Sequence, residues 1–117
     1  THLSAGADVL TGSAQMVIGA IGKAQEAGAY WFGTQADQTS FASDVVVASQ
    51  VYHWDVILRE IFALRGEGVM GGKTFSANLE NGGQVIKIND GLGLDQAVLD
   101  KANETIQGII DGTVTIP

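Results

Sequence analysis

The chain has 117 residues, 45% of them apolar and 16% charged, as is typical of one globular domain with a hydrophobic core. Its formal charge is −7, from 13 acidic and 6 basic residues, and it contains no cysteine. Nucleic-acid binding depends on contacts from Lys and Arg to phosphate, so this balance argues against a nucleic-acid partner. The lack of thiols excludes disulfides and cysteine-based metal sites within the chain.

The first third of the chain predicts a strand–helix–strand unit. Residues 7–11 have the pattern of a short buried strand, and residues 14–27 that of a helix ending at Gly28. On this helix Val17, Ile18, Ile21 and Ala24 share one face. Residues 29–34 form the second strand. The turns are short, so we expect the two strands to be parallel.

The rest of the chain predicts one more strand, two helices and a hairpin. Three consecutive valines indicate a strand at 45–50, and a wide apolar stripe that includes Trp54 indicates a helix at 52–66 whose Trp54 lies in the core. Asn81-Gly82 lies between two alternating segments and predicts a two-stranded β-element over 74–88. A last helix is expected at 94–111. We therefore expect a single α/β unit over residues 1–117, with a parallel sheet between helical layers (α/β/α).

A polar loop follows the second predicted strand. Residues 33–38 include Gln35 and Asp37, and ligands of α/β sheets bind outside the carboxyl ends of parallel strands. This order of elements predicts a small-molecule site. Asp37 has two interpretations, a ligand contact or a cap on a local backbone N–H. His2 and His53 lack acidic partners at metal-ligand spacing, so we expect no metal site and no cofactor.

Several segments in order resemble the basic membrane lipoprotein (BMP) family of substrate-binding proteins for ABC transporters. Residues 6–10, Gly-Ala-Asp-Val-Leu, are similar to the family's "GADVI" strand. Residues 33–38 are similar to its "GVDxDQ" loop, and residues 47–52 stand where the family has "LTSxxK". Residues 106–117 are similar to its last helix. The resemblance spans essentially the whole chain.

The resemblance implies a partial type I periplasmic-binding-protein-like fold. Family members have two lobes that close around a purine base or nucleoside, and this chain matches only their C-terminal portion. The implied protein is an extracytoplasmic receptor, lipid-anchored to the plasma membrane through a segment outside this chain, that delivers its ligand to an ABC permease. A piece cut from such a receptor has unpaired strand edges, so we expect it to self-associate.

Two departures from the family pattern bear on the ligand. Gln35 replaces the first Asp of "GVDxDQ" and Tyr52 replaces the Lys of "LTSxxK", so the charged pair implied to hold ribose is absent. Amide and phenol groups suit a purine base or a similar flat heterocycle. Ser13 and Gln15 stand where the family has a glycine-rich loop.

The residues expected to bind the ligand each stand in one of the segments compared with the family. They are Ser13, Gln15, Gln35, Asp37 and Tyr52. The leading interpretation is a binding module without turnover. An enzyme that uses Asp37 as acid or base is a weaker alternative, because no catalytic triad, no carboxylate pair at a strand end and no metal cluster is visible. A sensor or oligomerisation domain that reuses the receptor fold, without a transport role, is the third interpretation.

Overall fold

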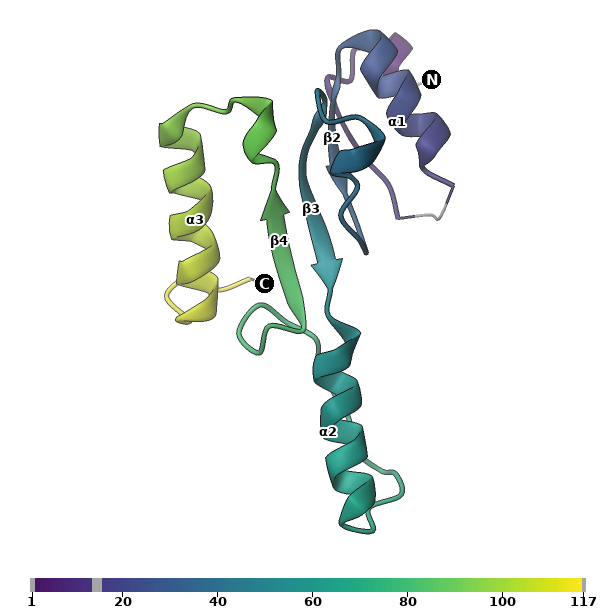
Figure 1. The fold of residues 1–117 in the computed structure, drawn as a ribbon. Helices are drawn as coiled ribbons and strands as arrows, with labels where there is room; N and C mark the ends of the chain where they lie inside the picture. The colour runs from purple at the N-terminus through teal and green to yellow at the C-terminus, as the bar shows by residue number, and fades with distance from the viewer. Residues whose placement is uncertain (1, 14–15, 117) are drawn as a thin grey trace. The chain divides into compact units, whose positions relative to one another are not determined.

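The computed structural model describes residues 2–13 and 16–116 (Figure 1). Their contacts divide the chain into two compact units, residues 1–51 with 86–96 and residues 52–85 with 97–117. We call these the first and the second unit and describe each by itself. The assignment of residues 1–117 to one unit of a two-lobe receptor stays a prediction.

The chain has an α/β fold built on a four-stranded sheet, in the order β1-β2-β3-β4. β1 (Val9–Thr11) pairs in parallel with β2 (Tyr30–Gly33), and β2 pairs in parallel with β3 (Val46–Tyr52). These parallel pairings confirm the prediction. β4 (Gln84–Ile88) runs opposite to β3 in Figure 1, so the complete sheet is mixed.

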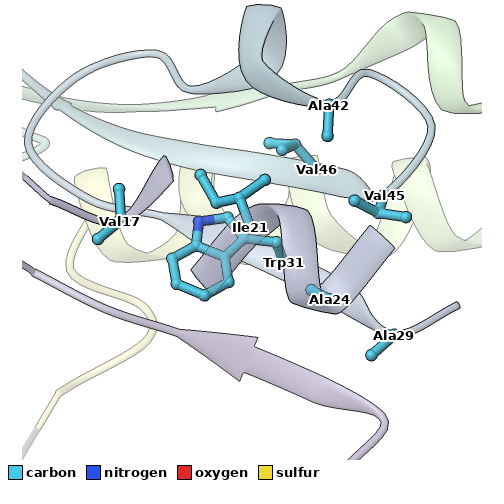
Figure 2. Packing of buried hydrophobic residues seen from close by; sticks show 8 residues of the cluster. All are labelled: Val17, Ile21, Ala24, Ala29, Trp31, Ala42, Val45 and Val46. Carbon is cyan, nitrogen blue, oxygen red and sulfur yellow. The ribbon is translucent and has the colours of Figure 1, made fainter. Parts of the chain in front are cut away.

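The core of the first unit lies between the sheet and α1 (Ile18–Ala27). Figure 2 shows Ile21 of the helix beside Trp31 of β2, and both side chains are almost fully buried. Val17 and Ala24 complete the buried stripe at positions i, i+4 and i+7. Burial of a side chain such as Ile21 stabilises the fold by about 1.5–3 kcal/mol. The placement of Trp31 in the core is confirmed.

One residue of the predicted helix face is exposed. Ile18 is 59% exposed, because the stripe that reaches the sheet is narrower than the sequence pattern. The end of the helix is as predicted. Gly28 adopts φ 67°, and its N–H donates to the carbonyls of Ala24 and Gln25, as in a left-handed helix cap.

The opposite face of β1 and β2 is exposed. Val9 lies beside Tyr30 and Thr11 beside Phe32 in the parallel register, and these side chains alternate with the inward-facing Leu10 and Trp31. Tyr30 is 49% exposed and Phe32 41%. The first unit is therefore packed on one face of its sheet.

The second unit contains α2 (Trp54–Gly66) and most of α3 (Gln96–Ile110). Neither helix has a buried residue among those described. The apolar stripe of α2 has the predicted spacing, yet Trp54 is 60% exposed and Phe62 is 67% exposed. The prediction that Trp54 lies in the core is wrong. Its ring instead contacts that of Tyr52, with centroids 5.1 Å apart.

The predicted hairpin is half correct. β4 forms and Gly82 turns the chain at φ 70°, but residues 74–78 do not form a strand. The backbone N–H of Asn78 donates to the side-chain oxygen of Asn81 at 3.1 Å, and the backbone N–H of Asn81 donates to the side-chain oxygen of Asn78 at 2.9 Å. Asn81 also donates to the carbonyl of Ser76 at 2.7 Å. These local bonds satisfy backbone groups that a strand ladder would otherwise use.

Candidate functional site

The ends of the two parallel strands β1 and β2 bring two turns together in the first unit. The Thr34 hydroxyl donates to the carbonyl of Gly12 at 2.7 Å. The Gln35 side-chain amide donates to the carbonyl of Ser13 at 3.2 Å. Ser13 and Gln35, both predicted as ligand residues, thus lie side by side at the carboxyl edge of the sheet. This edge is where α/β sheets bind ligands.

Gln35 has an unusual backbone. Its φ is 74°, and it is the one non-glycine residue with a positive φ among the described residues. Side chains with a Cβ are strained in this region, and such strain clusters at binding sites. Gln35 is exposed, and its amide offers both a donor and an acceptor. The strained backbone therefore presents an uncharged polar group at the edge.

Asp37 is engaged within the protein. One carboxylate oxygen accepts from the backbone N–H of Thr39 at 3.0 Å, and the other lies 2.6 Å from the Lys87 ammonium on β4. Lys87 and the Thr39 N–H lower the pKa of Asp37 to about 2. Asp37 in turn raises the pKa of Lys87. The interpretation of Asp37 as a cap on a local N–H is confirmed, whereas ligand contact stays a prediction.

Three residues near the turn were not recognised from the sequence. Gln38 is 6% exposed and Ser49 is 1% exposed, and the Gln38 N–H donates to the Ser49 hydroxyl at 3.1 Å. Gln38 and Ser49 lie inside segments 33–38 and 47–52, which resemble family motifs, so the sequence did draw attention to these positions. Nothing in the sequence indicated Lys87, because it lies 50 positions after Asp37 and the sequence does not show which strand lies near that carboxylate.

Two more residues were predicted to bind the ligand. Gln15 lies outside the described residues. Tyr52 belongs to the second unit, where it contacts Trp54. Its role in ligand binding stays a prediction.

A hollow of about 620 Å³ adjoins the turn after β1. It lies within the first unit, and Gly12, Ser13 and Trp31 line it together with Leu10 and Met16. The volume is within the range of small-molecule sites, and the walls are mainly apolar. Ser13 thus borders both the hollow and the polar edge.

Across residues 2–13 and 16–116, no group of three or more His, Cys, Asp or Glu side chains could hold a metal ion. In the same ranges, no helix combines the length and apolar character that crossing a bilayer requires.

Comparison with known proteins gives structural likenesses only. No protein-family model and no curated protein matches the chain. A crystal structure of a transcriptional activator of the comK gene from Bacillus halodurans superposes with a TM-score of 0.80 at 14% identity, over 99% of this chain and 41% of that one. An ABC transporter system solute-binding protein from Conexibacter woesei superposes with a TM-score of 0.65 at 18% identity, over 98% and 39%.

These likenesses establish the fold. The chain shares its fold with part of both structures and spans about two-fifths of their length. The same architecture occurs in a protein described as a transcriptional activator. One fold serves several functions, so a conclusion about function has to rest on the residues of the site.

Proposed function

We propose that this chain is the C-terminal portion of an extracytoplasmic, lipid-anchored solute-binding protein that delivers a purine base or similar heterocycle to an ABC permease. The likeness to the Conexibacter woesei protein supports the receptor fold. The observation that carries the proposal is the edge after β1 and β2, where the exposed Gln35 amide is held beside the Ser13 carbonyl.

The electrostatics of the turn favour an uncharged ligand. Asp37 is the one ionisable side chain in residues 33–38, and its charge is balanced by Lys87. The Gln35 amide offers an acceptor and a donor, which complement the edge of a purine ring. A ribose with two hydroxyls would need partners that the replaced Asp–Lys pair supplies in the resembled family. We therefore expect the complete receptor to prefer the base over the nucleoside.

We further propose that the ligand is bound without turnover. Asp37 is the candidate acid or base of an enzymatic alternative. A carboxylate with a pKa of about 2 accepts protons poorly near neutral pH, where an efficient base has a pKa close to that of the medium. The ion pair of Asp37 with Lys87, and the hydrogen bond that Asp37 accepts from the Thr39 N–H, support a structural role instead.

The test is calorimetry of the complete receptor with adenine and with adenosine. A buried polar group without a partner costs about 1–3 kcal/mol, so we expect adenosine to bind about 5- to 150-fold more weakly than adenine. Gln35→Ala should weaken adenine binding at least about tenfold, whereas the matched surface variant Gln25→Ala on α1 should leave it unchanged. Equal affinity for base and nucleoside, or release of adenine from adenosine, would contradict the proposal.

A second candidate function is supported by the Bacillus halodurans structure, which is described as a transcriptional activator and has the higher TM-score. In that case the receptor fold would sense a ligand without transporting it. Uptake of labelled adenine by cells with and without the gene separates the two functions. A transport receptor predicts loss of uptake on deletion, and a sensor predicts unchanged uptake.

A further inference from the structure

Gln38 lies behind the turn and connects three parts of the first unit. Its side-chain oxygen accepts a hydrogen bond from the indole N–H of Trp31 at 2.7 Å. Its side-chain nitrogen donates to the carbonyl of Thr34 at 2.9 Å. Its backbone N–H donates to the Ser49 hydroxyl at 3.1 Å. With 6% exposure, Gln38 is a buried polar residue bonded to β2, to its own turn and to β3.

The bond from Gln38 to Thr34 closes the turn around Gln35. Thr34 is also held on its other side, because its hydroxyl donates to the carbonyl of Gly12. Gln35 follows directly and carries the positive φ of 74°. A residue with a Cβ keeps a positive φ only where its surroundings hold the backbone in place. Here the hydrogen bonds of Thr34 and Gln38 hold the backbone on both sides of Gln35.

The packing behind the turn leaves no free space. A Cβ built on Gly33 would lie 2.6 Å from the Ser49 hydroxyl and 3.0 Å from the side-chain oxygen of Gln38. The Gln38 amide thus fills the space between the turn and β3. A smaller or apolar side chain at position 38 would leave Trp31 without its acceptor and Thr34 without its donor.

We propose that Gln38 is a positioning residue, which holds residues 34–37 so that the Gln35 amide stands in its binding geometry before a ligand arrives. The inference rests on the proposed function of Gln35. It goes beyond that function by assigning pre-organisation of the site to one buried side chain and its partners Trp31 and Ser49. Pre-organisation raises affinity because the turn is already ordered in the free protein, so binding loses less conformational entropy.

The test compares three variants in the complete receptor. Gln38→Leu has a side chain of similar size and removes both side-chain amide bonds, and Trp31→Phe removes the indole donor together with part of the buried ring. Ile21→Val is the matched control, because Ile21 belongs to the same buried cluster as Trp31 and lies on α1 and not in the turn. Calorimetry with adenine, corrected for the folded fraction, gives the affinity. Hydrogen exchange of the backbone N–H groups of residues 35–38, without ligand, reports whether the turn is held.

We expect Gln38→Leu to weaken adenine binding at least about tenfold and Trp31→Phe by a smaller factor, with Ile21→Val within about twofold of the unmodified receptor. We also expect faster exchange at residues 35–38 in the first two variants alone. Affinity of folded Gln38→Leu within twofold of the unmodified receptor, or an equal loss in Ile21→Val, would overturn the positioning role. If Gln38→Leu does not fold, Trp31→Phe decides by the same criteria.

Failure of the proposed function is distinguishable from failure of this inference. A receptor that binds neither adenine nor adenosine refutes the purine function, and the exchange measurement then decides the role of Gln38 alone. Faster exchange of residues 35–38 in Gln38→Leu, with Ile21→Val unchanged, supports it. Unchanged exchange in Gln38→Leu overturns it.

Discussion

Gly33 is the position where the structure predicts the sharpest steric effect. It ends β2 directly before the turn and is buried. A Cβ at this position would lie 2.6 Å from the Ser49 hydroxyl, 3.0 Å from the side-chain oxygen of Gln38 and 3.1 Å from its side-chain carbon. Contacts under 3.0 Å require a neighbour to move. Both neighbours are held by hydrogen bonds, so neither can move without loss.

We expect Gly33→Ala to lower the free energy of unfolding by about 1–3 kcal/mol, the range for added volume in a filled core. The matched control is Gly22→Ala in the middle of α1, where an added Cβ would meet nothing within 4 Å. There the loss of glycine's flexibility in the unfolded chain should stabilise the protein by about 0.5–1 kcal/mol. The same substitution thus has opposite signs at the two positions.

The assay is urea unfolding of the protein and its variants, followed by tryptophan fluorescence. Ser49→Ala removes the nearest contact atom, so Gly33→Ala should cost less in that background. The coupling between the two substitutions should exceed about 0.5 kcal/mol. A neutral or stabilising Gly33→Ala, or strictly additive effects of the two substitutions, would refute the packing described for this turn.

Three further predictions follow from the same structure. Because the pKa of Asp37 is lowered from 3.8 to about 2 in the folded chain, its stabilising contribution is present above about pH 4 and lost as the pH falls toward 2. Asp37→Asn should lower the free energy of unfolding by about 0.5–1 kcal/mol at pH 6, a figure reduced because the ion pair is partly exposed, and by almost nothing at pH 2. An equal loss at both pH values in urea titrations would contradict this. The double variant Gln35→Asp with Tyr52→Lys should raise the affinity for adenosine relative to adenine by about tenfold in calorimetry. An unchanged ratio of the two affinities would mean that other residues recognise the sugar. The isolated 117-residue chain should form dimers or larger assemblies at micromolar concentration, since Tyr30, Phe32 and Phe62 are exposed, and a clean monomer mass in light scattering argues against it.

Local patterns predicted the elements of the fold well and their burial less well. The helix over α1 and its end at Gly28 followed from spacing and from a residue that tolerates positive φ. Trp54 was assigned to the core because it lies in an apolar stripe, yet it is exposed, and Ile18 is exposed although it shares the apolar face of its helix. An apolar stripe states what a helix can bury, whereas burial itself depends on which other segments pack against it.

The candidate site shows the same limit at the level of single side chains. Ser13 and Gln35 were both predicted as ligand-binding residues, and the structure brings them together because parallel strands place their ends at one edge. The partner of Asp37 could not be predicted, since Lys87 reaches it only through the antiparallel placement of β4. Likewise, the sequence contains Gln38 and Ser49 but not the hydrogen bond between them.

The turn after β2 divides its side chains between two tasks. Thr34 and Gln38 form hydrogen bonds with β2, β3 or the turn after β1, and Asp37 pairs with β4, so these residues stabilise the arrangement. Gln35 combines exposure with a strained backbone, and its one hydrogen bond given by the structure, to Ser13, is the longest in the turn. Strain and exposure both lower a residue's contribution to stability. A residue that adds little to stability, yet is held in place by its buried neighbours, is suited to recognition, and this contrast supports the proposal that Gln35 binds the ligand.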